Sequence, residues 1–153
     1  DFEEPYQLSD IPRNKRAEIG RLISAPYLNN NEYYPRNLII LFLFDSIINF
    51  LTKNNLVAGY AFIKKRLKDK LDKLKIPVHT IDKYTQIYSE DKVLYKYFTQ
   101  PKDPVVPIYF IREEIKERVN EIINNKKMFE VKNDKYFLKE DFYNKFLRFL
   151  DII

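Results

Sequence analysis

Basic side chains gathered on one short segment are the residues in this chain best suited to chemistry. Between Ala61 and Lys75 there are seven lysines and arginines against two aspartates, a local charge of +5. The other 138 residues hold 20 basic and 20 acidic side chains, so the formal net charge of +5 lies on this segment. A local positive field of this kind attracts phosphate groups. If the segment binds nucleic acid, the residues that follow the phosphate backbone are expected to be Lys64, Lys65, Arg66 and Lys68.

The same segment also fits a solvent-exposed helix face that binds nothing. Three pairs of opposite charges are four residues apart, the spacing at which they pair along one helix: Lys65 with Asp69, Lys68 with Asp72, and Asp69 with Lys73. Lysines that flank an apolar stripe also cover it with their methylene groups while the ammonium group stays in water. Both interpretations, phosphate binding and a solvated face, stay open from the sequence.

A second basic cluster, formed by Arg13, Lys15, Arg16 and Arg21, precedes a tyrosine-rich loop. Arg21 and Arg36 lie on either side of Tyr33 and Tyr34. Guanidinium groups pair with phosphates while aromatic rings stack on bases, and single strands and nucleotides require both. The alternative is that the two tyrosines pack ahead of a helix that starts at Pro35. We expect the nucleic-acid- or nucleotide-binding residues to include Arg21, Tyr33, Tyr34 and Arg36.

The residue inventory gives little support for catalysis or for a metal site. The chain has no cysteine and one histidine, His79, which excludes thiolate metal sites, cysteine nucleophiles and any pair of histidine ligands. Its two glycines cannot build a glycine-rich phosphate loop. No aspartate pair has the Asp-x-Asp spacing that many two-metal sites use. We therefore expect no catalytic residues, no metal and no resident cofactor.

The apolar pattern predicts a mostly all-α protein. The length of 153 residues suits one domain with a core. Apolar residues recur three and four positions apart over most of the chain, which is typical of helices. Near 128–138, Asn133 and Asp134 separate two apolar segments and indicate a small β-hairpin. We expect a compact bundle of about six helices, at roughly 12–24, 35–51, 56–75, 81–88, 89–98, 111–123 and the C-terminal end, where 81–88 and 89–98 are either two helices or one bent helix.

Prolines and charge suggest how the chain is organised. Residues 1–10 are expected to be a flexible acidic lead-in, and 11–153 a single helical domain. Prolines at 101, 104 and 107 predict an extended connector over 101–108, because each removes a backbone donor and disfavours helix at the preceding residue. The longest apolar stretch, 38–51, is short of the roughly 20 residues that cross a bilayer. With no secretory pattern at the start, we expect a cytoplasmic protein without a membrane partner.

One stretch carries a family resemblance. It begins with Tyr34-Pro35-Arg36-Asn37, continues as an apolar helix to Leu51, breaks at Asn54-Asn55 and resumes as a basic helix through Phe62 and Leu67. Over roughly 34–98 this order resembles the C-terminal domain of archaeal and eukaryotic primase large subunits. Where that family has a second proline and a cysteine, this chain has Arg36 and Asn37. Because the chain has no cysteine, the family's iron–sulfur cluster is excluded.

A cluster-free helical version of that domain is typical of the PriX-type non-catalytic subunits of crenarchaeal primases. The resemblance implies an accessory subunit or domain of an archaeal-type DNA primase that assists primer initiation in DNA replication. It also implies ATP or another NTP and the single-stranded DNA template as ligands, with the small and large primase subunits as partners. The alternative is a helical protein-interaction subunit without nucleic-acid binding, which would dock through 101–110 or through a phenylalanine-rich C-terminal helix.

Overall fold

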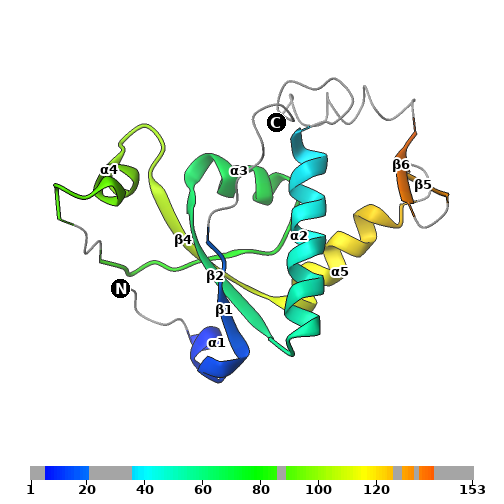
Figure 1. Ribbon diagram of the computed structural model, residues 1–153, viewed down its shortest axis with the longest axis horizontal. Helices are drawn as coiled ribbons and strands as arrows, with labels where there is room; N and C mark the ends of the chain where they lie inside the picture. The colour runs from blue at the N-terminus through cyan, green and yellow to red at the C-terminus, as the bar shows by residue number, and fades with distance from the viewer. Residues whose placement is uncertain (1–5, 21–35, 86–88, 126–128, 133–134, 140–153) are drawn as a thin grey trace.

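A four-stranded sheet occupies the centre of the computed structural model, which describes residues 6–20, 36–85, 89–125, 129–132 and 135–139 (Figure 1). The sheet order is β1-β2-β4-β3, and β5 and β6 form a separate two-stranded hairpin. The strands are β1 (Arg16–Glu18), β2 (Ala58–Lys64), β3 (His79–Thr80), β4 (Val105–Ile111), β5 (Phe129–Lys132) and β6 (Lys135–Leu138). The helices are α1 (Tyr6–Ser9), the 3-10 turn η1 (Arg13–Lys15), α2 (Arg36–Lys53), α3 (Lys65–Lys73), α4 (Val93–Thr99) and α5 (Arg112–Ile123).

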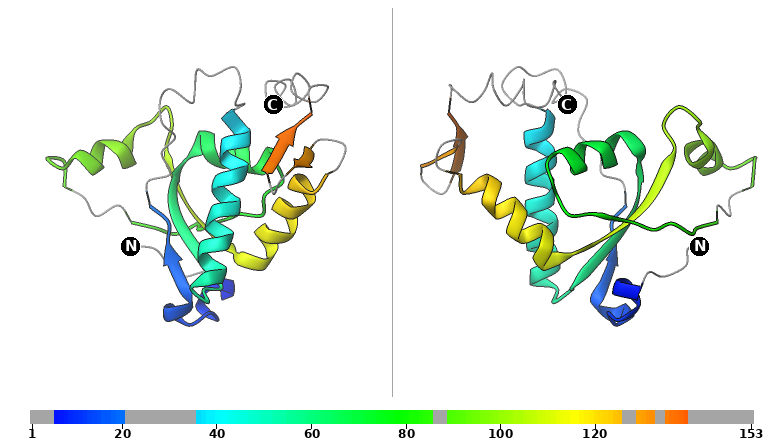
Figure 2. Two further views of the ribbon diagram at one scale, coloured as in Figure 1. Left: turned by 45° about the vertical axis from the view of Figure 1, so that its right-hand side comes forward. Right: turned by 180° about the vertical axis from the view of Figure 1, so that it is seen from behind.

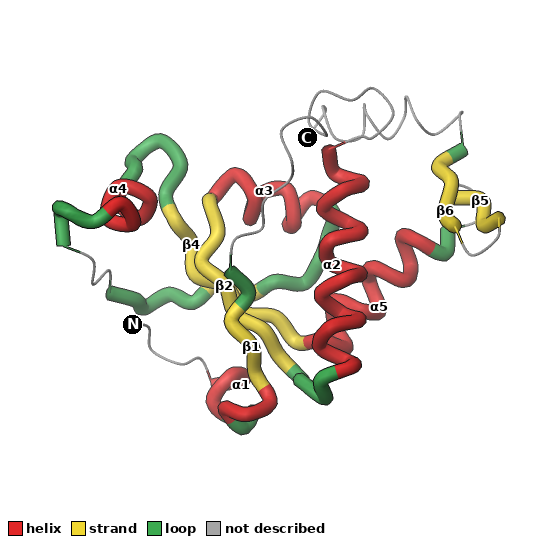
Figure 3. The backbone as a smooth tube through the Cα atoms, in the orientation of Figure 1, coloured by secondary structure: helices red, strands yellow, loops and turns green. Residues whose placement is uncertain are grey.

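The expectation of an all-α bundle is therefore wrong, because the protein is mixed α/β (Figure 3). The helices predicted at 35–51 and 111–123 are present as α2 and α5, and the hairpin expected near 128–138 is present as β5 and β6. The predicted C-terminal helix lies outside the described residues. Within the expected lead-in, α1 forms and buries Leu8 completely. None of the described helices is both long enough and apolar enough to cross a membrane.

Long antiparallel pairing between β2 and β4 forms the middle of the sheet. The register runs from Ala58 opposite Ile111 to Lys64 opposite Val105. The short strand β1 pairs parallel with β2, and the segment between them contains α2. The short strand β3 pairs antiparallel with the other side of β4. The two central strands are thus flanked by short edge strands.

The two faces of the sheet are covered differently. Because side chains alternate along a strand, Ala61, Ile63 and Ile108 point to one face. There they join a large buried cluster that includes Phe44 of α2, Leu71 of α3 and Val119 of α5 (Figure 2). A smaller cluster covers the other face: Leu8, Ala58, Ile81 and Tyr109, with Ile11, Tyr60 and Ile111 against them.

Burial on both faces explains why β2 was predicted as helix. A strand covered on both sides carries an almost continuous apolar run, and such a run cannot be distinguished from a buried helix by its period. Residues 56, 60, 63 and 67 also happen to fall at helical spacing. The helix begins only at Lys65, so the expected helix over 56–75 is a strand followed by the nine residues of α3.

Pro107 lies in the central strand β4, inside the stretch 101–108 where the prolines predict an extended connector. The second half of that stretch is the start of β4, and Pro107 is fully buried. Its carbonyl accepts a hydrogen bond from the Ile81 amide at 2.9 Å, so its nitrogen faces the same neighbouring strand. The pairing of β3 with β4 stops at Thr80, which lies opposite Ile108. At the next position of that register, Pro107 would have to donate a backbone N–H, which proline lacks. The strand tolerates the proline because its partner ends there.

Candidate nucleic-acid interface

The predicted residues Lys64, Lys65, Arg66 and Lys68 come together where β2 passes directly into α3. Lys64 is extended and is the residue before the helix, so the other three lie in the first turns of α3. The start of the helix is fixed by the α4–β4 loop: the Lys65 amide donates to the Pro104 carbonyl at 2.8 Å. Its end is fixed by Arg118 of α5, whose Nε donates to the Leu74 carbonyl at 3.0 Å.

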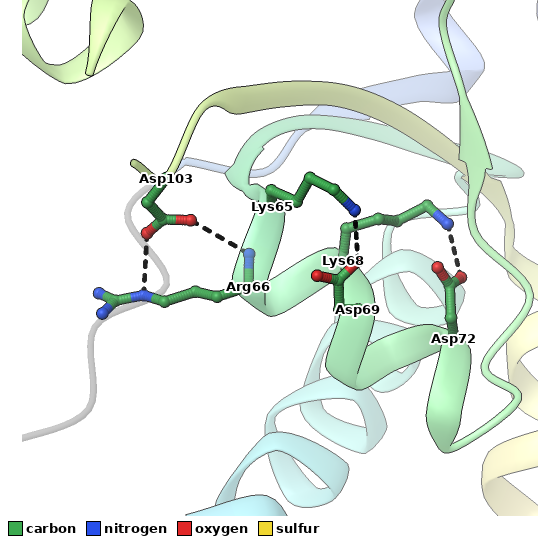
Figure 4. Close-up of polar contacts among 6 residues, drawn as sticks. All are labelled: Lys65, Arg66, Lys68, Asp69, Asp72 and Asp103. Carbon is green, nitrogen blue, oxygen red and sulfur yellow. Dashed lines mark hydrogen bonds and ion pairs between the residues drawn. The ribbon is translucent and has the colours of Figure 1, made fainter. Parts of the chain in front are cut away.

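Asp103 holds Arg66 in one orientation (Figure 4). One carboxylate oxygen accepts the Arg66 backbone amide at 3.1 Å, and the other lies 3.1 Å from Arg66 Nε. The Arg66 side chain is 81% exposed while that of Asp103 is only 19% exposed. Figure 4 shows the two Nη atoms directed away from Asp103. The guanidinium group therefore keeps outward donors of the kind that bind phosphate oxygens in pairs.

Lys65 and Lys68 form the two i, i+4 pairs expected for a solvated face. Lys65 Nζ is 2.7 Å from Asp69 Oδ1, and Lys68 Nζ is 2.5 Å from Asp72 Oδ1. The hydrogen bond to Asp69 raises the pKa of Lys65, so its ammonium group stays charged. An exposed pair such as Lys65–Asp69 contributes about 0–1 kcal/mol, so a phosphate oxygen can replace that carboxylate at small cost, whereas the Lys68 side chain is only 15% exposed.

A second row of basic residues follows another side of α3. Arg66, Lys70 and Lys73 are four and three residues apart and so follow one side of the helix, next to the apolar stripe that contains Leu71. Asp69 lies four residues before Lys73, the spacing at which opposite charges pair along a helix. The row formed by Arg66, Lys70 and Lys73 is called the basic row below.

Lys64 has a structural role that the sequence did not suggest. Its Nζ donates to the carbonyl of Tyr97 near the C-terminal end of α4, and it lies 4.1 Å from the centroid of the Tyr97 ring. Gln100 Oε1 is a further acceptor at 3.4 Å. Carbonyls at the end of a helix are otherwise unpaired, so a lysine there acts as a cap. Lys64 thus connects α4 to the sheet.

The other predicted binding residues cannot be placed as fully. Arg21, Tyr33 and Tyr34 lie outside the described residues, and Arg36 is the first residue of α2, with its side chain outside them. The backbone does show that α2 begins at the same end of the molecule as α3 (Figures 1 and 2). Of the earlier basic cluster, Arg13, Lys15 and Arg16 lie by the start of β2, since Arg16 pairs with Ala58, whereas α3 follows the end of β2.

His79 contacts two side chains from neighbouring elements. Its ring stacks on Tyr109 at a centroid distance of 4.9 Å, and its Nε2 is 2.8 Å from Glu114 Oε2. These contacts join β3 to the first turn of α5. In the part of the chain that the structure describes, no group of three or more histidine, aspartate or glutamate side chains gathers around a point that could hold a metal ion.

Comparison with protein-family models, with curated proteins and with solved structures found no match to this chain. The primase resemblance depended on a continuous basic helix through Phe62 and Leu67, and Phe62 lies in β2 instead. The resemblance stays a prediction. The surface around α3 is the feature of this chain that bears on its function.

Proposed function

We propose that this chain is a non-catalytic nucleic-acid-binding protein whose basic row on α3 contacts the phosphate backbone. The observation that carries the proposal is Arg66, which Asp103 positions with its Nη atoms directed outward. Lys70 and Lys73 extend the same side of the helix at intervals of one turn. The helix is fixed at both ends by other segments, which keeps these groups in place for binding.

A role beside a primase is the finer form of this proposal, and it requires the same surface. An accessory subunit that assists primer initiation has to hold a template strand, and phosphate contacts supply most of the affinity for any strand. The alternative of protein docking through 101–110 loses support, because Ile108, Tyr109 and Phe110 are buried in β4. The phenylalanine-rich C-terminal helix, the other docking surface of that alternative, lies outside the described residues.

Changing the basic row to glutamine should weaken nucleic-acid binding and its salt dependence. The triple variant Arg66→Gln, Lys70→Gln, Lys73→Gln removes up to three phosphate contacts. The slope of log affinity against log salt should fall by about 2–3 in magnitude, with an affinity loss of about tenfold or more at low salt. Fluorescence anisotropy with a labelled oligonucleotide, titrated at several salt concentrations, measures both.

The matched control removes the same number of positive charges from other parts of the surface. The triple variant Lys53→Gln, Lys116→Gln, Lys132→Gln also removes three positive charges, from α2, α5 and β5. It should retain the slope of the unchanged protein. Equal losses in both triple variants would mean that only the overall charge matters, and the basic row would not be a binding site.

A further inference from the structure

Exposed apolar side chains concentrate around α4, close to the basic row. Among the described residues, four large apolar side chains are exposed, and two of them, Leu94 and Tyr97, lie in α4. Figures 1 and 3 show α4 apart from the helices that cover the sheet. Grouped apolar side chains at a surface usually mark a binding site.

The ring of Tyr97 is held in place although it is 39% exposed. Phe98 contacts it edge to face at a centroid distance of 5.6 Å, and Phe98 in turn packs on Phe62 of β2 at 5.4 Å. Lys64 lies over the ring and holds the adjacent backbone carbonyl. An aromatic side chain fixed in this way loses little conformational entropy when a ligand stacks on it.

Tyr97 also lies close to the proposed phosphate-binding arginine. Burial is the main reason that the pKa of Tyr97 is raised, but the charge of Asp103 raises it further and that of Arg66 lowers it. The contacts of Lys64 with Tyr97 also place the ring beside the start of α3, because Lys64 is two residues before Arg66. A tyrosine phenol is neutral at physiological pH even at its ordinary pKa, so the ring carries no charge that would repel a nucleic acid.

We propose that Tyr97 is a base-stacking subsite and that the ligand of this surface is single-stranded nucleic acid. An unpaired base stacks on the exposed part of the ring while Arg66 binds a neighbouring phosphate, the combination used by single-strand-binding surfaces. Bases inside a duplex are already stacked on each other and cannot reach the ring. This inference rests on the proposed function, because Arg66 supplies the phosphate contact.

The variant Tyr97→Leu should separate single strands from duplexes. Loss of one stacked base costs about 1–3 kcal/mol, so affinity for a labelled oligothymidine should fall about fivefold to 150-fold. Affinity for a duplex and the salt slope should stay unchanged, because no phosphate contact is lost. Tyr97→Phe keeps the ring and should bind like the unchanged protein. Phe50→Leu, at an exposed aromatic residue of α2, is the matched control and should also have no effect.

The outcomes distinguish this subsite from the proposed function. If the unchanged protein binds neither oligothymidine nor duplex at low salt, the proposed function fails and the subsite with it. If the basic-row variant weakens binding but Tyr97→Leu binds oligothymidine normally, the subsite is overturned and the proposed function stands. If Tyr97→Leu changes only the concentration-dependent self-association of the protein, seen by analytical ultracentrifugation, the surface is a protein interface and the subsite is overturned.

Discussion

Replacing Phe110 with alanine is expected to lower the free energy of unfolding by about 3–5 kcal/mol. The side chain is 1% exposed and lies in the central strand β4. It contacts Phe44 of α2 edge to face, with ring centroids 6.2 Å apart, so its removal leaves a cavity between sheet and helix. Urea denaturation followed by circular dichroism measures the loss.

An exposed phenylalanine provides the control for this substitution. Phe50 of α2 is 52% exposed, so Phe50→Ala removes the same atoms without opening a cavity. It should change the free energy of unfolding by about 0.5 kcal/mol or less, as most surface substitutions do. A loss of similar size in both variants would contradict the position of Phe110 in the core.

Gly59→Ala is expected to destabilise the protein by about 1–3 kcal/mol through overpacking. Gly59 lies opposite Phe110 in the β2–β4 register. A Cβ atom on Gly59 would lie 2.3 Å from Phe110 Cζ and 2.6 Å from Cε2, and the buried ring has no free space to move into. Gly20→Ala is the control, because nothing lies within 4 Å of a Cβ atom there.

A double variant tests whether the ring is the cause. Phe110→Leu removes the ring atoms that the new Cβ atom would meet, so Gly59→Ala should cost less when the leucine is present. The free energy lost in the double variant should be smaller than the sum of the two single losses by about 1 kcal/mol. Strict additivity would show that Gly59 is required for a reason other than Phe110.

The helices that the sequence predicted correctly are those with one clearly buried side. In α5, Ile115, Val119 and Ile122 recur at helical spacing among charged residues, and all three are buried. The strands were missed where local pattern and tertiary environment differ. β2 is covered on both faces, and Pro107 of β4 is tolerated only because β3 ends beside it. Neither condition is visible without knowing which strands are neighbours.

In the candidate site, too, some contacts can be predicted from the local sequence and others cannot. Spacing alone predicts the pairs Lys65–Asp69 and Lys68–Asp72, because both partners lie on one helix. The contacts of Arg66 with Asp103 and of Lys64 with Tyr97 join residues 37 and 33 positions apart. They form because the β2–β4 register sets Lys64 opposite Val105, which brings the loop before β4 to the start of α3. A local pattern contains no information about that register.

The wide sequence separation within the central strand pair also affects how the protein is made. Ala58 pairs with Ile111, so the middle of the sheet cannot close on the ribosome until both strands have been synthesised. Contacts between residues this distant slow folding, because the intervening chain must first be ordered. During synthesis, the apolar residues of β2 are exposed until β4 has been made. Exposed apolar segments with a preference for β-structure bind other unfolded chains. The nascent chain is therefore expected to depend on chaperones until β4 has emerged.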